Sequence, residues 1–253
     1  MKGVIFIVSF FMLIIVLSSF PCQVNVLRAQ ETQDSELQDV NLSDYYSLLD
    51  GNIWVYDKKT KEGEGEEVFE IDGQETVGGV AALKLFIGDA NYQLLNKNEY
   101  GIVMLKKYDL SNGEYLDFDP YVMVFPFSEN NGKVYEFACR EYGKDNNLHN
   151  DASGKGRVIV QNMGREDVEV PAGSFPQCVK LLVYLEGSLN NGDNGKMNET
   201  TWFAKNVGMV KKIIEGSDYD SNTKETSSYT TELQLKQATV NGSAYGADNS
   251  TPE

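Results

Sequence analysis

The sequence of 253 residues holds little of what common enzyme and nucleic-acid signatures require. It has 3 cysteines and 1 histidine, and 38 acidic residues outnumber 22 lysines and arginines. The formal net charge of -16 at pH 7 argues against a nucleic-acid partner, because phosphate neutralisation needs clustered basic side chains. No GxSxG, HExxH, CxxC or phosphate-loop pattern occurs. The sequence therefore predicts no catalytic residue, no metal ligand and no cofactor, and we expect the protein not to be an enzyme.

The single histidine, His149, lies in the polar segment KDNNLHNDASGKG. A general base needs a shaped and partly dry pocket, which this segment does not indicate. We therefore expect His149 to be a solvated and dispensable loop residue. The alternative is a general base that acts with Asp145 or Asp151.

Long apolar runs are absent except near the N-terminus, where residues 4–17 read VIFIVSFFMLIIVL after Lys2. Fourteen residues at about 1.5 Å each are too short to cross a hydrocarbon core of about 30 Å. Residues 1–29 are therefore predicted to be a signal peptide that is cleaved after Ala29. An uncleaved anchor and a lipoprotein acylated at Cys22 are the alternatives. The protein is expected to be exported to the periplasm or the extracellular space, or to associate with the envelope.

Cleavage leaves two cysteines, Cys139 and Cys178. An exported protein can oxidise such a pair. A Cys139–Cys178 disulfide is one interpretation. Two buried, reduced thiols are the other, because free cysteine behaves as a small apolar residue.

Short segments rich in Val, Ile, Tyr, Phe and Thr recur between Ile53 and Leu235. Turn pairs such as Asp72-Gly73, Asn112-Gly113 and Asn191-Gly192 separate them, and these pairs favour tight hairpins. No window keeps a clean helical period. The sequence predicts an all-β fold, built as a single curved antiparallel sheet or a half-open barrel with at most a short helix.

The chain divides into four predicted regions. The signal peptide (1–29) is followed by a flexible leader (30–43), a β-rich domain (44–235) and a disordered tail (236–253). The one helical candidate, residues 44–49, is too short to cover a concave sheet alone.

Candidate ligand-binding residues are aromatic residues on predicted strands: Trp54, Tyr56, Phe125 and Trp202. Such side chains can line a cavity or form a plain core. The segment from Val179 to Glu186 is apolar on one face and partly apolar on the other, which favours a curved sheet that covers something on both sides.

Four segments carry a resemblance to a known family. They are YYSLLDGNIWVY (45–56), EDVEVPAGSFPQCVKL (166–181), WFAKNVGMVK (202–211) and TEL (231–233). Together they resemble a family of uncharacterised exported bacterial proteins, although Ser47 and Asn206 replace a Pro and a Gly of the family pattern. The resemblance implies a fold similar to the half-open barrels of periplasmic lipoprotein carriers, in which a curved sheet holds an acyl chain. It transfers no functional residue.

We expect an exported, non-enzymatic protein that binds a lipid, another apolar ligand or a partner on a concave β-sheet. The main alternative is a structural or surface-interaction protein whose own core fills the sheet. A hydrolase that uses paired carboxylates is a third hypothesis.

Overall fold

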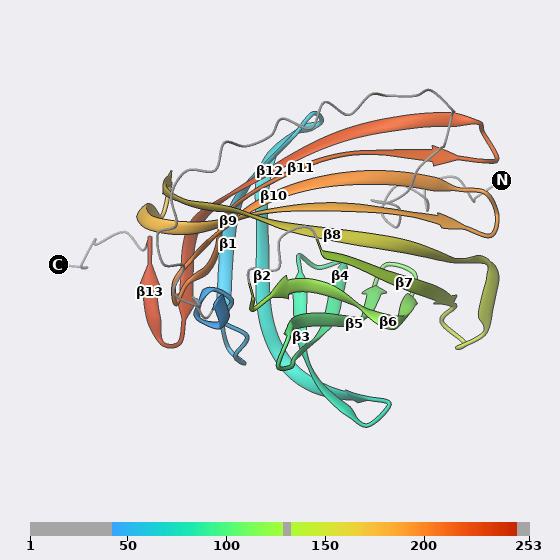
Figure 1. Ribbon diagram of the computed structural model, residues 1–253, viewed down its shortest axis with the longest axis horizontal. Helices are drawn as coiled ribbons and strands as arrows, with labels where there is room; N and C mark the ends of the chain where they lie inside the picture. Colours follow the sequence, from blue (N-terminus) through green and yellow to red (C-terminus); the bar gives the residue numbers. More distant parts are fainter. Residues whose placement is uncertain (1–41, 129–132, 247–253) are drawn as a thin grey trace.

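The computed structural model describes residues 42–128 and 133–246, without the side chains of residues 150–152. One antiparallel sheet accounts for nearly all of this part of the chain (Figure 1). The predicted signal peptide, Cys22 and most of the predicted leader lie outside the described residues. The described part contains no helix that is long and apolar enough to cross a membrane.

Thirteen strands follow a single turn of 3-10 helix, η1 (Leu42–Tyr45). In chain order the strands are β1 (Ile53–Thr60), β2 (Gly63–Val77), β3 (Val80–Ile87), β4 (Asn91–Lys97), β5 (Gly101–Asp109), β6 (Glu114–Pro126), β7 (Lys133–Tyr142), β8 (Leu148–Val170), β9 (Gly173–Leu189), β10 (Asn194–Ala204), β11 (Gly208–Asp220), β12 (Glu225–Val240) and β13 (Ser243–Tyr245). The all-β class and the near absence of helix are thus confirmed.

The sheet is closed, which corrects the expectation of an open sheet or half-open barrel. Each strand pairs with the next along the chain, and β1 also pairs with β12 from Ile53↔Thr239 to Thr60↔Thr231. Twelve strands therefore form a barrel, and β13 adds only a short pairing to β12. Closure satisfies the backbone N–H and C=O groups that the two edges of an open sheet would leave unpaired.

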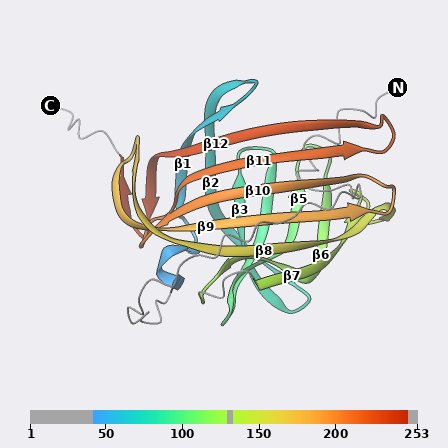
Figure 2. The ribbon, with the colours of Figure 1, turned by 45° about the horizontal axis from the view of Figure 1, so that its top comes forward.

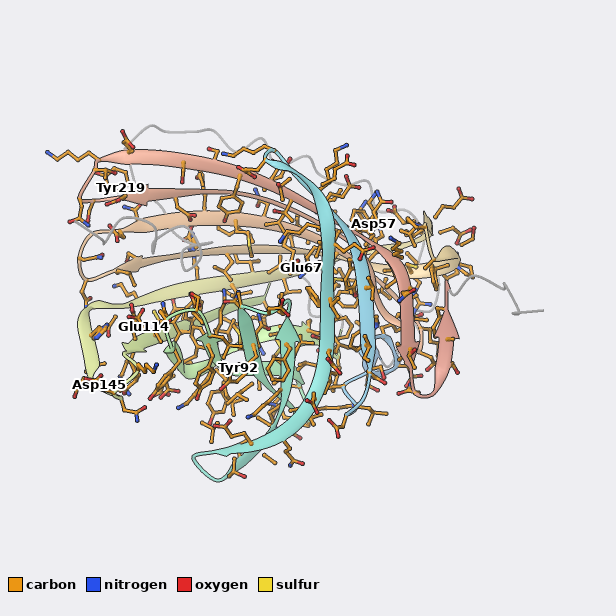
Figure 3. All side chains as sticks on the ribbon, turned by 180° about the vertical axis from the view of Figure 1, so that it is seen from behind. Asp57, Glu67, Tyr92, Glu114, Asp145 and Tyr219 are labelled. Atoms are coloured by element: carbon orange, nitrogen blue, oxygen red, sulfur yellow. The ribbon has the colours of Figure 1, made fainter. Side chains whose placement is uncertain are left out.

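The barrel is flattened into two dissimilar parts (Figures 1 and 2). Strands β8 to β12 run side by side, and β3 to β7, which are shorter except for β6, face them from the other side. Strands β1 and β2 run steeply between the two parts. The hairpins at one end of the long strands project well beyond β1 and β2, so that Tyr219 lies far to one side of Asp57 in Figure 3.

Some predicted turns have a different role in the structure. Asp72 and Gly73 lie inside β2, at a shift of register between Ile71 and Gln74. They form a bulge that bends the strand rather than a hairpin turn. The corner from Pro171 to Gly173 does join β8 to β9 as expected, and the Ala172 N–H donates to the Leu235 carbonyl at 2.8 Å.

The predicted domain boundaries at residues 44 and 235 are too narrow. Leu42 is buried in the main core, although the sequence places it in the leader. Strand β12 continues to Val240, where Ala238 and Val240 are buried, and β13 reaches Tyr245. Residues 236–245 therefore belong to the sheet, because pairing with β1 and β13 compensates for their polar composition.

Apolar residues that alternate along the strands form the main core inside the barrel. On β9, Val179 and Leu181 are buried, and Val183 and Leu185 continue the same face. A second, smaller cluster joins Ala82, Leu94, Val103, Leu105 and Met123, and Val77 and Val80 from the end of the β2–β3 hairpin pack against it. The alternation expected for β9 is thus confirmed.

Candidate functional site

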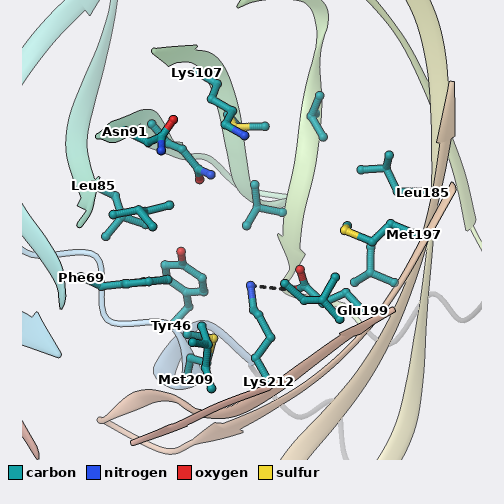
Figure 4. A pocket seen from close by; sticks show the side chains of 18 of the residues that line it. Tyr46, Phe69, Leu85, Asn91, Lys107, Leu185, Met197, Glu199, Met209 and Lys212 are labelled. Atoms are coloured by element: carbon teal, nitrogen blue, oxygen red, sulfur yellow. Dashed lines mark ion pairs between the residues drawn. The ribbon is translucent and has the colours of Figure 1, made fainter. Parts of the chain in front are cut away.

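A cavity of about 520 Å³ lies inside the barrel, between the short and the long strands (Figure 4). Twelve strands enclose more space than their side chains fill, because the diameter of a barrel grows with the number of strands. Most of the lining side chains are apolar. They include Phe69, Leu85, Ile87, Met104, Phe118, Phe137, Leu185, Met197 and Met209.

Two ion pairs are built into the cavity wall. Lys58 Nζ on β1 lies 2.6 Å from Glu67 Oε1 on β2. Lys212 Nζ on β11 lies 3.0 Å from Glu199 Oε1 on β10, and Figure 4 shows this second pair directed into the cavity. Each lysine neutralises its partner, so these four residues add no net charge to the site.

Tyr46 enters the cavity from the segment that follows η1. Its ring packs against Phe125 and Phe203, with centroid distances of 5.6 and 5.7 Å. Figure 4 shows its hydroxyl directed into the open space. Burial raises the pKa of Tyr46 well above the usual value, and the Glu199 carboxylate adds to this effect. The hydroxyl therefore stays protonated and can donate a hydrogen bond to a bound molecule.

Trp54 and Tyr56, two of the four aromatic candidates, line the cavity. Trp54 Nε1 donates to the Val207 carbonyl at 2.8 Å, and Tyr56 Oη donates to the Met209 carbonyl at 2.9 Å. Both bonds cross the interior from β1 to the region of β11. These residues therefore hold the cavity wall in place as well as forming part of it.

The other two candidates, Phe125 and Trp202, are not among the residues that line the cavity. Phe125 is fully buried behind Tyr46 and Phe203. Trp202 lies on the opposite face of β10 from Glu199, with Lys180 and Lys211 over its ring at 5.0 and 5.6 Å. The structure thus brings together only half of the predicted set, because Trp202 points to the other face of its strand and Phe125 lies behind the lining residues Tyr46 and Phe203.

The cysteines are not bonded to each other. Cys139 and Cys178 are both free and buried, and burial raises the pKa of each thiol to about 11. They lie on β7 and β9, and β8 runs between these strands. Two strand spacings of about 4.8 Å exceed the reach of a disulfide, about 7 Å between Cα atoms. The predicted alternative of two reduced thiols is the correct one.

Several lining residues escaped the sequence analysis, above all the charged ones. Lys212 shares an alternating face with Val210 and Ile214, so a lysine among apolar residues was the signal that could have revealed it. Lys107 offered no such signal, because a bulge between Met104 and Lys106 shifts the alternation of β5.

A separate polar cluster lies outside the cavity lining. The nearest ligand atoms of Glu114, Glu141 and His149 all lie within 4.8 Å of one another, a geometry that could hold a cation. His149 Nδ1 is 3.6 Å from Glu141 Oε1. His149 thus lies on β8 opposite Glu141 on the neighbouring strand β7, so it belongs to a strand and not to the expected loop, although its side chain is 39% exposed.

Comparison with known proteins gives a family match over part of the chain. The DUF3108-like family model matches residues 142–232. This stretch runs from the end of β7 into β12 and contains the corner at Pro171 and the segment that begins at Trp202. The match agrees with the expected resemblance to an uncharacterised family, but it leaves the first part of the barrel unmatched.

One solved structure is distantly similar. It is described as a putative lipoprotein from Parabacteroides distasonis ATCC 8503, is 18% identical and gives a TM-score of 0.39. The alignment covers 76% of this chain and 98% of that chain. No curated protein matches the sequence significantly. The comparisons therefore assign no function.

Proposed function

We propose that this protein is an exported, non-enzymatic binding protein that holds an apolar ligand inside its closed barrel. The observation that carries the proposal is the cavity of about 520 Å³ with predominantly apolar walls. Ligand sites commonly have volumes of roughly 300–1,000 Å³ and such walls, with a few polar groups that orient the ligand.

Packing density supports the same conclusion. Protein interiors are normally packed like organic crystals, and an empty apolar space costs free energy in proportion to its size. A core that fills itself, the alternative interpretation, would not leave this volume between Leu85, Leu185 and Met197. A bound apolar molecule would make dispersion contacts with these side chains.

Two features favour binding over catalysis. The only histidine, His149, is not a lining residue, so the cavity has no imidazole base. Its carboxylates, Glu67 and Glu199, are each already engaged in an ion pair with a lysine.

The proposal can be tested with the uncharged fluorophore N-phenyl-1-naphthylamine. We expect a saturable rise in its emission and an increase in the Tm of the protein, because a ligand of the folded state stabilises that state. Leu185→Trp places a larger side chain in the cavity and should weaken binding. Leu182→Trp, on the other face of β9, is the matched control and should bind as the wild type does.

Circular dichroism of both variants establishes that they are folded. If the folded wild-type protein neither binds the fluorophore saturably nor gains thermal stability, the binding function is wrong. The interpretation of the protein as a structural component would then replace it.

A further inference from the structure

Lys107 differs from the other half-buried lysines that line the cavity. Its side chain extends from β5 into the cavity beside Asn91 (Figure 4). Among the described residues, no hydrogen bond or ion pair involves Lys107 Nζ. Lys58 and Lys212 each have a glutamate within 3.0 Å, and the remaining lining lysine, Lys155, is exposed. The cavity therefore holds one ammonium group that lacks a paired counter-charge.

The nearest acid along the strand does not supply that counter-charge. Asp109 is buried, and its Oδ1 accepts hydrogen bonds from Ser111 N at 2.9 Å and from Ser111 Oγ at 2.6 Å. Burial lowers the pKa of Lys107, and the Asp109 carboxylate counteracts this only in part. The ammonium is thus poorly compensated, and isolated charges inside proteins are costly unless they are paired.

Two residues with neutral amide side chains lie beside Lys107 on the neighbouring strand β4. Gln93 is its register partner on β4, and Asn91, two residues earlier, opposes Asp109. Both amide side chains line the cavity. Because amide nitrogens donate hydrogen bonds, one ammonium and two amides form a donor set that suits a single negative charge.

We propose that the cavity takes an amphiphile with one apolar chain and a carboxylate head, and that the head binds Lys107 with Asn91 and Gln93. This inference rests on the proposed function and names the class of ligand. The chain would lie along the apolar walls, between Phe69, Leu85 and Met209. The head would supply the counter-charge that Lys107 lacks, and the two existing ion pairs would stay intact.

The first measurement compares ligands on the full wild-type chain at pH 7. Dodecanoate and dodecan-1-ol share a chain length and differ in the charge of the head. Each competes with N-phenyl-1-naphthylamine for the cavity. We expect dodecanoate to bind at least about tenfold more tightly, since a charge-assisted hydrogen bond contributes that much or more. Equal affinities for dodecanoate and dodecan-1-ol would overturn the proposed carboxylate head. The proposed binding of an apolar ligand would still stand.

The second measurement locates the head. Lys107→Met keeps the length and apolar character of the side chain and removes the charge. It should weaken dodecanoate binding by about tenfold or more, while binding of dodecan-1-ol changes by less than about threefold. Lys106→Met is the matched control, because Lys106 lies over the Tyr115 ring at 4.5 Å and is not a lining residue.

Lys107→Arg, which keeps the charge, should retain most of the preference for dodecanoate. If Lys107→Met still prefers dodecanoate over dodecan-1-ol, the carboxylate head binds elsewhere and the proposal is wrong. Failure of the wild-type protein to bind the alcohol, the carboxylate and the fluorophore would instead overturn the proposed function itself.

Discussion

Glu141 is a buried carboxyl group with a second carboxyl group beside it. Burial raises its pKa to about 7 from a usual value of 4.5, and the charge of Glu114 adds to this effect, whereas His149 acts against it. The folded protein therefore keeps this proton up to near neutral pH, whereas the unfolded chain releases it near pH 4.5. Because the unfolded state binds fewer protons in this window, stability falls as the pH rises from about 4.5 to about 7.

Replacing the Glu141 carboxyl group by an amide should remove this loss of stability at higher pH. We expect Glu141→Gln to have little effect at pH 4.5 and to raise the free energy of unfolding by on the order of 1–3 kcal/mol at pH 8, where the wild-type group is charged. Urea denaturation at both pH values measures this difference. Glu136→Gln, at an exposed site on the same strand, should show no such pH-dependent gain, and an equal gain there would contradict the assignment.

Cys139 and Cys178 give a second prediction at the residue scale. Both thiols are buried, and burial raises the pKa of each to about 11, so almost no reactive thiolate exists at pH 8. Iodoacetamide should leave both residues unmodified in the folded protein and modify both in urea, as peptide mass mapping would measure. A reducing agent should leave the Tm unchanged, and a lower Tm would contradict the free state of these cysteines.

At the scale of single elements, close approach explains several glycines. Gly216 on β11 pairs with Tyr229 on β12, and a Cβ atom at Gly216 would lie 2.1 Å from the Tyr229 hydroxyl oxygen. The phenol ring thus covers the strand where a side chain would otherwise be. Gly156 on β8 similarly leaves room for the Phe137 ring, because its Cβ would lie 2.6 Å from that ring.

Gly216→Ala should therefore destabilise the protein by about 1–3 kcal/mol, as overpacking does elsewhere. In a Tyr229→Ala background the same change should cost much less, with a coupling energy of about 1 kcal/mol or more in a double-mutant cycle. Gly65→Ala is the control, since nothing lies within 4 Å of the added atom. If the destabilising effects of Gly216→Ala and Tyr229→Ala are additive, the Tyr229 ring does not restrict the Gly216 site.

At the scale of the whole molecule, closure of the barrel depends on the contact between β1 and β12. Lys59 and Glu232 are register partners across it. Cα atoms of directly opposed residues lie about 4.5–5.5 Å apart, which is within the range for a disulfide. Lys59→Cys with Glu232→Cys should therefore form a bond on mild oxidation, which non-reducing peptide mapping would detect.

Lys59→Cys with Thr226→Cys is the matched control, because Thr226 pairs with Tyr219 at the far end of β12. This pair should stay reduced under the same conditions. An open sheet would bring neither pair together. Absence of the first bond in folded protein would therefore mean that the barrel is not closed.

The local sequence was sufficient to predict the fold class and much of the strand pattern. Alternation along Val179–Glu186 identified the inward face correctly, because a strand has a fixed period of two. The corner at Pro171–Gly173 was also predictable, since proline and glycine have narrow backbone requirements. Trp54 and Tyr56 were chosen as aromatic residues on a predicted strand, and both line the cavity.

Only the tertiary structure decided that the barrel closes, that the two cysteines stay free and that a cavity forms. The pairing of β1 with β12 joins residues about 180 positions apart in the sequence, and no local signal specifies which edges meet. The distance between Cys139 and Cys178 follows from strand order, which places β8 between them. Lys107 faces the cavity because a bulge changes the alternation of β5. Sequence therefore determined what each strand is, and long-range pairing determined what the strands enclose.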